Sequence, residues 1–440
     1  MQLIKKIHKK SKQRNLSLAE KLAMAATALL GPAVQAQSAD EDEWEFVGSI
    51  LTYSEPDRVT AIEGIFSAEK TFGDSAKLGY KVILDSLTGA SANGAITQRE
   101  VQTFTRPSGN GQYIIDAQDV PLDDTFKDTR GQFNINWTDA LTEDSRYTVG
   151  SNFSKEYDYL SLSVNGEYAK DFDRKNTTLS IGASFASDTI DPEGGRPLGL
   201  SSMVVNTGQF ASNDDFKNTF RSTRINGEGS VDTVELLLGW TQIINRRMLM
   251  QLNYSYADMS GYLTDPFKVI SVIDNNAIAH DYLYEHRPDS RSQHTIYAMT
   301  KYHFEDSIVD LSYRYLTDDW DIDSHTIDFK WHVFAGNNTF WEPHIRFYQQ
   351  SAAEFYSTYL VENQALPQFV SSDYRVGDMD AVTVGLKYGF STGAGNRIEI
   401  RGEYYKQTPN ANGAEAVLAA GTLDLYPTVD ALAIQVTYYF

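Results

Sequence analysis

Four aspartates that stand close together could bind a cation: Asp318, Asp319, Asp321 and Asp323. Carboxylates at this density repel one another unless a positive charge lies between them, and Ca²⁺ accepts several oxygen ligands in a flexible geometry. The spacing lacks the glycine turn and the later glutamate of an EF-hand loop. The run therefore predicts either a calcium site or, more simply, solvated acids and ion pairs with Arg287 and Arg291.

A mixed-charge run precedes these aspartates and contains Glu285, His286, Arg287, Asp289 and Arg291. Arginine forks in such a run could recognise an anionic group. An ion-pair network that fixes a loop needs the same residue types, and it is the interpretation we favour.

Catalytic motifs are weak. No Ser/His/Asp grouping can be defended, and the glycine pair in 191–197 lacks the spacing of a phosphate loop. His332 and His344 fall on adjacent expected strands, where they could bind a metal or simply be hydrogen-bonded. The chain has no cysteine, which excludes a cysteine nucleophile or ligand. We expect no catalytic residue, no enzyme activity and no cofactor beyond the calcium alternative.

Charged side chains also recur at alternate positions of apolar segments, on the face opposite the apolar one. In a membrane barrel that face lines the interior, and rings of charge set selectivity in pores. Opposite charges on neighbouring strands could instead lock the lumen closed. The expected lumen residues are Asp310, Arg314, Asp328, Lys330, His332, His344, Arg346, Lys387, Arg397, Glu399, Arg401 and Glu403.

The last segment indicates which kind of sheet carries these residues. Residues 432–440 alternate strictly, and Tyr438 and Phe440 lie on the apolar face. This ending is similar to the C-terminal assembly signal that outer-membrane barrels present to their insertion machinery. An ordinary strand of a soluble sheet would leave an aggregation-prone edge.

The same alternation predicts an all-β fold, a transmembrane antiparallel up-and-down β-barrel of about sixteen strands. Fourteen strands remain if 44–68 is a periplasmic extension. The expected strands are 44–53, 58–68, 76–85, 130–138, 146–155, 160–171, 177–187, 233–244, 247–260, 293–303, 307–316, 322–333, 340–350, 381–390, 396–406 and 432–440.

The connections alternate in length. Counting back from a periplasmic C-terminus places short turns on the periplasmic side and long connections on the outer side, as in bacterial barrels. The expected outer connections are 86–129, 188–232, 261–292, 351–380 and 407–431.

Residues 1–36 are typical of a cleavable signal peptide, with a basic start, a short apolar run and Val34-Gln35-Ala36 before the cut. Residues 37–440 would then form one barrel in the outer membrane of a Gram-negative cell. Cleavage would remove seven of the 38 Lys and Arg and one of the 59 Asp and Glu, leaving a formal net charge of −27. So acidic a chain lacks the basic surface that nucleic-acid binding requires.

Several runs together resemble a bacterial family catalogued as domain of unknown function 3570. They are 84–91 with 93–95, 154–159, 261–268, 284–289, 318–322 and 355–356. The resemblance covers 44–440 and implies an outer-membrane barrel without a settled activity. It also implies a link to periplasmic redox and flavin-transfer proteins.

Three functions follow as hypotheses. The first is a porin-like channel for small polar solutes with a charged lumen, inserted in outer-membrane lipid by the barrel-insertion machinery. The second is a non-conducting barrel that docks a periplasmic or surface partner, in keeping with the redox link. An enzyme that acts on lipid or glycan is the third, and nothing supplies its nucleophile and base.

Overall fold

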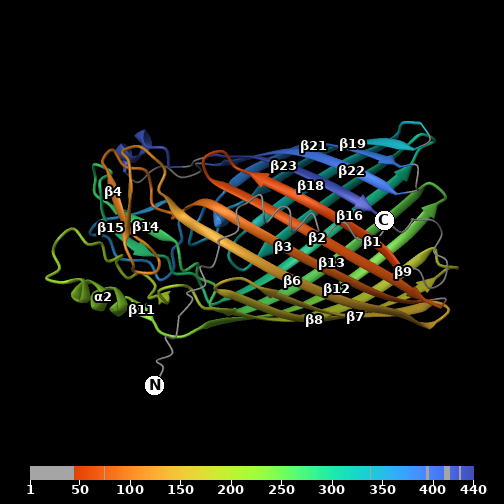
Figure 1. Cartoon of the computed structure of the whole chain (residues 1–440), viewed down its shortest axis with the longest axis horizontal. Coiled ribbons are helices and arrows are strands. Elements are labelled where there is room, and N and C mark those ends of the chain that lie inside the picture. The colour runs from red at the N-terminus through yellow and green to blue at the C-terminus, as the bar shows by residue number, and fades with distance from the viewer. Residues whose placement is uncertain (1–43, 74, 337, 393–395, 411–416, 426–427) are drawn as a thin grey trace, which may run out of the picture.

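The computed structural model describes residues 44–440 except 74, 337, 393–395, 411–416 and 426–427. The predicted signal peptide, 1–36, lies outside the described residues. Two parts are visible, a closed barrel and a cap at one end of it (Figure 1).

Sixteen antiparallel strands form the barrel, and β1 pairs with both β2 and β23 to close it. Both the fold class and the strand number predicted from the alternation are therefore confirmed, and the fourteen-strand alternative is wrong. The barrel strands are β1 (Trp44–Ser54), β2 (Val59–Phe72), β3 (Ala76–Ala92), β6 (Leu122–Thr142), β7 (Ser145–Lys155), β8 (Tyr159–Phe172), β9 (Thr177–Ile190), β12 (Gly229–Asn245), β13 (Met248–Gly261), β16 (Ser290–His303), β17 (Ser307–Asp318), β18 (Asp323–Phe334), β19 (Thr339–Gln350), β21 (Met379–Ser391), β22 (Arg397–Pro409) and β23 (Val429–Tyr439).

The outward face of the barrel is apolar and uncovered. Val164 and Ile181 are each 56% exposed, and Leu238 is 52% exposed. Inward positions of the same region are polar, as where Gln132 donates to Asn152 over 2.9 Å. An exposed apolar belt around a polar interior suits hydrocarbon outside, and closure leaves no strand edge unpaired in lipid.

The C-terminal residue completes the barrel wall. The backbone N–H of Phe440 donates to the carbonyl oxygen of Phe46 over 3.0 Å, next to the pairing of β1 with β23. Its ring is buried and lies 4.6 Å from the ring of Tyr438. The terminal aromatics therefore lie at the seam that closes the sheet.

One hairpin is longer than its alternation indicates. β3 continues to Ala92 and β6 begins at Leu122, so the expected outer connection 86–129 is partly strand. Apart from Leu87, the side chains of residues 86–92 are small and show no alternation of polar and apolar faces, because this end of the hairpin lies beyond the apolar belt. Gly89 has φ +141°, and a Cβ there would lie 2.0 Å from the carbonyl oxygen of Arg58. Glycine thus allows the close approach at this bend.

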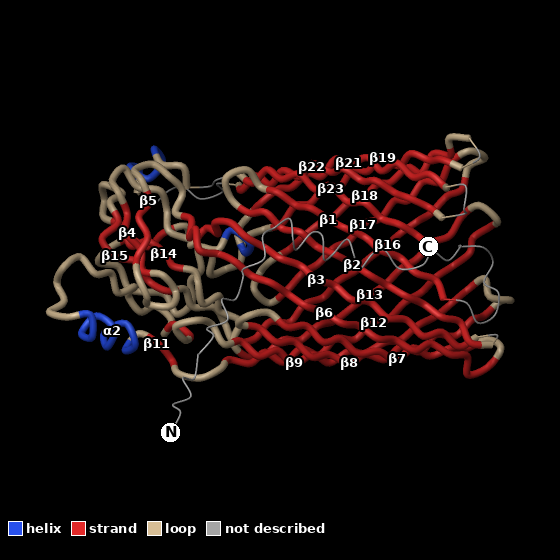
Figure 2. The backbone as a smooth tube through the Cα atoms, viewed as in Figure 1, coloured by secondary structure: helices blue, strands red, loops and turns tan. Residues whose placement is uncertain are grey.

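The long connections are folded structure and not open loops. They form the cap, defined as the described residues of 93–121, 191–228, 262–289, 351–378 and 410–428, at the left in Figure 2. Its elements are β4 (Gln102–Thr105), β5 (Gln112–Ile115), β10 (Arg196–Pro197), α2 (Asn213–Ser222), β11 (Arg224–Ile225), β14 (Val269–Ile273), β15 (Ala279–Tyr284), β20 (Tyr359–Val361) and the 3-10 helices η1 (Tyr374–Val376) and η2 (Leu418–Thr422).

The cap has hydrophobic cores that draw on several connections at once. One core joins Ile96, Ile273, Tyr359 and Val417, which come from four different connections. A three-stranded sheet, β15-β14-β20, joins two connections through a parallel pair. The connections therefore fold together as one unit. Within the described chain, no helix is long and apolar enough to cross a membrane.

Candidate functional site

Ion pairs form a ladder along one wall of the lumen, on β18, β19, β21 and β22. His332 Nδ1 lies 3.0 Å from Glu342 Oε2, and Lys387 Nζ lies 2.9 Å from Glu342 Oε1. Lys387 also lies 3.6 Å from Glu399, which pairs with Arg397 at 3.1 Å. Each carboxylate of this row therefore has cationic or imidazole partners on its own or a neighbouring strand.

A second row runs beside the first and is centred on His344. Its Nδ1 lies 2.8 Å from Glu403, and its Nε2 lies 2.9 Å from Asp328. Arg401 pairs with Glu403 at 3.5 Å, and Arg346 donates to Asp328 over 2.7 Å. His332 and His344, considered either as a metal pair or as hydrogen-bonded residues, thus bond to different carboxylates.

The remaining expected lumen residues also lie on the inward face by strand register. Lys330 lies 3.3 Å from Asp328, and Lys301 pairs with Asp310 at 3.2 Å. Arg314 is exposed and has no ion pair with any described residue. A cavity of about 530 Å³ runs against this wall and reaches Lys81 of β3.

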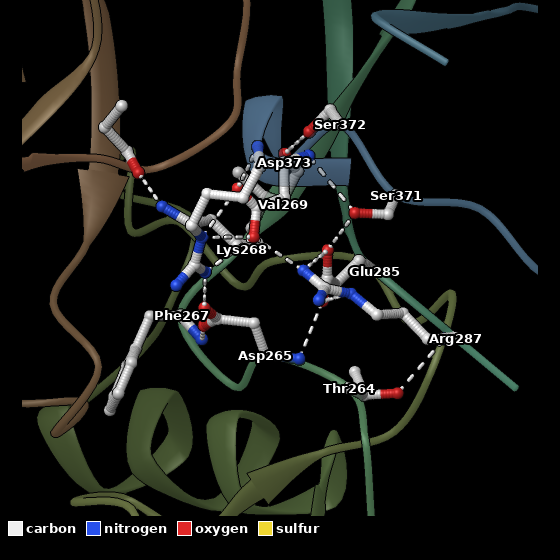
Figure 3. Close-up of polar contacts among 12 residues, drawn as sticks. Thr264, Asp265, Phe267, Lys268, Val269, Glu285, Arg287, Ser371, Ser372 and Asp373 are labelled. Atoms are coloured by element: carbon white, nitrogen blue, oxygen red, sulfur yellow. Dashed lines mark hydrogen bonds and ion pairs between the residues drawn. The ribbon is translucent and has the colours of Figure 1, made fainter. Parts of the chain in front are cut away.

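A second concentration of charge lies in the cap, with its centre buried, and we call it the cap network (Figure 3). It consists of Asp265, Lys268, Glu285, Arg287, Asp373 and Arg375. Arg287 lies between two carboxylates: its Nη2 donates to Asp373 over 2.7 Å, and its Nε lies 2.7 Å from Glu285. Both carboxylate side chains are fully buried.

Hydrogen bonds hold this centre on several sides. Glu285 accepts the Asp265 N–H over 2.6 Å and the Ser371 hydroxyl over 2.5 Å. Arg375 donates from Nε to both oxygens of Asp373, at 2.9 and 2.8 Å, and its Nη2 donates to Asp265. Lys268 donates to the carbonyl oxygen of Ala92, at the end of β3. The network therefore ties two connections, 262–289 and 351–378, to the barrel rim.

Burial and neighbouring charges shift the pKa values of the two central acids, Glu285 and Asp373, in opposite directions. Burial raises the pKa of Glu285 to about 7, against the opposing charge of Arg287. Burial would also raise the pKa of Asp373, but Arg375 holds that pKa below its ordinary value. Asp373 is thus the permanent anion, and Glu285 titrates near neutrality.

Other residues of the predicted mixed-charge run are spread around this centre. His286 pairs through its backbone with Val370, and its Nδ1 lies 2.9 Å from the carbonyl oxygen of Gln368. The carbonyl of Asp289 accepts the N–H of Gly261 over 2.8 Å. Arg291 lies on the barrel wall and pairs with Asp318 at 2.5 Å.

The four aspartates considered as a calcium site do not form a group that could hold a metal ion among the described residues. Asp318 points inward to Arg291 and accepts the backbone N–H groups of Trp320 and Ile322 over 3.0 and 2.9 Å. Asp323 accepts the Tyr315 hydroxyl over 2.8 Å, on the outward face. Asp318 and Asp323 therefore point to different sides of the turn, and the ion-pair alternative holds for Arg291. Arg287 does not pair with this run.

A different acidic trio does gather at the rim: Asp128, Glu156 and Asp158. One carboxylate oxygen from each lies within 4.8 Å of the others, which is close enough to hold a cation. Burial, and then the contact with Asp128, raises the pKa of Glu156 to about 7. Its members come from two segments, so spacing in the sequence does not indicate it.

A cavity of about 490 Å³ separates the cap from the rim beside this trio. Its lining includes Asn93, Tyr157, Phe267 and Lys268, which belong to three runs that carry the family resemblance, together with Arg375. In the sequence these runs stand far apart. The fold brings them to one vestibule between cap and lumen, which we call the rim cavity.

A closed sheet with an apolar exterior and a charged interior defines an outer-membrane β-barrel, here with a folded cap. The chain belongs to the family described as "Protein of unknown function (DUF3570)", whose model matches residues 19–440. The predicted family is thereby confirmed.

Solved structures of similar fold share little sequence with the chain. The ferric enterobactin receptor PfeA from Pseudomonas aeruginosa has 8% identity and a TM-score of 0.42, over 84% of this chain and 55% of that one. The siderophore receptor PirA from Acinetobacter baumannii has 7% identity and a TM-score of 0.40, over 90% and 58%.

A bacterial polysaccharide outer membrane secretin has 9% identity and a TM-score of 0.41, over 92% of this chain and 100% of that one. The chain spans just over half the length of the siderophore receptors it matches. No curated protein sequence matches it. Likeness of fold at such identities carries no information on what this chain binds.

Proposed function

We propose that the protein is an outer-membrane channel for small polar solutes, with the cap controlling access to a charged lumen. The observation that carries the proposal is the polar inward face of the barrel, with a cavity of about 530 Å³ beside the charged ladder. Sixteen-stranded barrels are wide enough to leave an aqueous passage.

The ladder supports an open lumen more than a locked one. Its ion pairs join residues on the same or nearby strands of one wall, as with Lys387 and Glu342 on adjacent strands. Pairs of this kind line a passage and do not bridge it. The ladder therefore supplies charge along the route without closing it.

The cap places a second selective region before the lumen. Tyr374 of η1 lines the rim cavity, and the guanidinium of Arg58 lies 5.9 Å from its ring. A solute that enters from outside would meet the rim cavity first and the ladder second. This order favours controlled diffusion over a wide, open pore.

Conductance in planar bilayers tests the proposal. The full chain, refolded in detergent, is expected to give discrete current steps, and a detergent blank should give none. A bilayer that stays sealed at high load of folded protein would refute the channel. Cell fractionation and N-terminal sequencing of the mature protein would test outer-membrane location and cleavage after Ala36.

A second candidate function is a non-conducting barrel that docks a partner on its outer or periplasmic side. The folded cap favours it, because Ile114 and Val101 are 66% and 60% exposed on that unit. The redox link implied by the family resemblance points the same way. A protein that copurifies with the chain in mild detergent, together with the absence of conductance in planar bilayers, would support docking. Conductance without a copurifying partner would count against it.

A further inference from the structure

One part of the lumen wall is acidic and has no basic residue. On β8, β9 and β12, register places Glu167, Asp188 and Glu235 on the inward face. Neither these three strands nor β13, all fully described, has a lysine or arginine pointing inward. This wall lies away from the ladder on β18–β22.

Two of these acids have no partner to neutralise them. Asp188 accepts the hydroxyl of Tyr159 over 2.5 Å. Glu167 and Glu235 are exposed and make no ion pair or side-chain hydrogen bond with any described residue. Their neighbours across the strands are small, such as Gly182 beside Glu167 and Ser184 beside Glu235.

The basic residues of the opposite wall are largely neutralised. Lys387 and Arg397 both lie within 4 Å of Glu399, and Arg346 bonds to Asp328. Paired charges cancel one another at a distance, whereas an unpaired carboxylate in a water-filled lumen attracts cations. Lys81 of β3 and Arg314 of β17 are inward cations without an ion pair to a described residue, but both lie on other strands. On the acidic wall itself the uncompensated charge is negative.

From this distribution we infer that the channel prefers cations, and that Glu167 and Glu235 determine the preference. The inference rests on the proposed channel function. The favoured solutes are small cations, or solutes that turn a cationic group toward β8 and β12. Exposed Arg314 of β17 and Lys81 of β3 oppose the preference, because each is an inward cation without an ion pair to a described residue.

The test is the ratio of cation to anion permeability, from the reversal potential of the full-length protein in a KCl gradient. The double variant Glu167→Gln, Glu235→Gln should lower the ratio roughly two- to threefold at about 0.1 M salt, where the Debye length is about 10 Å. The effect should shrink at about 1 M salt, where that length is about 3 Å. Both glutamates are exposed, so the variants should fold.

Two controls separate lumen charge from other causes. Arg314→Gln removes a cation from the lumen and should raise the ratio. Glu305→Gln removes the same charge as the test variants from an exposed periplasmic turn, where the side chain is 85% exposed, and should leave the ratio unchanged. Shifts of opposite sign that fade with salt would support the inference.

Failure of the inference differs from failure of the proposed function. A channel that conducts but prefers anions, or whose ratio does not move in the double variant, overturns the inference alone. A sealed bilayer with folded wild-type protein overturns both.

Discussion

Replacing Arg287 by methionine removes a cation that lies between two fully buried carboxylates. The guanidinium contacts Asp373 and Glu285 at 2.7 Å each, and its side chain is only 10% exposed. Methionine keeps much of the volume of the stem and none of the charge. The substitution therefore isolates the electrostatic role of Arg287 in the cap.

The expected loss of cap stability follows from the charges that remain after the substitution. Removing one partner of a buried ion pair costs about 3–5 kcal/mol, because the other charge stays buried without compensation. Asp373 keeps Arg375, but Glu285 loses its nearest cation. Since the pKa of Glu285 is already raised to about 7, it can take up a proton below that pH. The loss should therefore be larger at about pH 8 than at about pH 5.5.

Hydrogen exchange by mass spectrometry on the protein in micelles measures this loss locally. Amides of β14 and β15 report opening of the cap, and amides of β8 and β9 report the barrel in the same sample. At about pH 8 the cap amides should lose two to nearly four powers of ten in protection, since about 1.4 kcal/mol corresponds to a factor of ten. The barrel amides should not change.

A matched variant sets the baseline. Arg247 lies 4.0 Å from Glu305 with both side chains more than half exposed, so Arg247→Met should change protection by less than about 0.5 kcal/mol. Unchanged cap protection in Arg287→Met at alkaline pH would refute the account of the network. Equal losses in cap and barrel would show that the two do not open separately.

Three further predictions concern pH, the rim and assembly. Glu285→Gln should remove most of the pH dependence of cap opening. In the wild type, the stability that comes from the raised pKa of Glu285 is present below about pH 4.5 and is lost as the pH rises through about 7, by at most about 3 kcal/mol. A wild-type cap that becomes more stable from about pH 5 to about pH 8 would contradict this prediction. Gly261→Ala should destabilise the folded protein in urea titration, because Gly261 has φ +129° and a Cβ there would lie 2.0 Å from the Ser230 carbonyl oxygen. The control is Gly227→Ala: Gly227 has φ +91° but no atom within 4 Å of a Cβ, so this variant measures the cost of the backbone angle alone. Phe440→Ala should lower the yield of folded barrel in outer membranes, measured as heat-modifiable protein on gels, whereas Leu366→Ala on the exposed cap should not.

Strand positions were predictable because lipid outside and water inside impose a period of two on every spanning segment. Residues 44–68, which the fourteen-strand alternative left out of the barrel, belong to β1 and β2. They form strands as the other segments do, since β1 supplies the edge that β23 requires. Beyond the apolar belt the period disappears. Residues 86–92 of β3 pair in a hairpin although neither face needs to be apolar. Alternation therefore underestimates strands outside the membrane.

The cap was not predictable from the sequence for a related reason. Its core residues, such as Ile96, Tyr359 and Val417, come from connections far apart in the chain and follow no period. The charge network shows the same limit. Glu285 and Arg287 stand in one mixed run, but Asp373 lies 86 positions after Arg287. The composition of the run indicated ion pairs, but only the fold determines the partners. Arg291 pairs with Asp318, whereas Arg287 pairs with Glu285 and Asp373.

The positions of these contacts link the cap to the lumen entrance. η1 carries Arg375 of the cap network and Tyr374 of the rim cavity on consecutive residues. The inward-facing Gln350 of β19 donates to the carbonyl oxygens of Arg375 and Gly377, over 3.1 and 2.6 Å. A shift of η1 that breaks the Arg375 contacts must also break these bonds to the wall. Because the same segment lines the rim cavity, we expect opening of the cap to enlarge that cavity as well, with a free energy that depends on the buried charges of the cap.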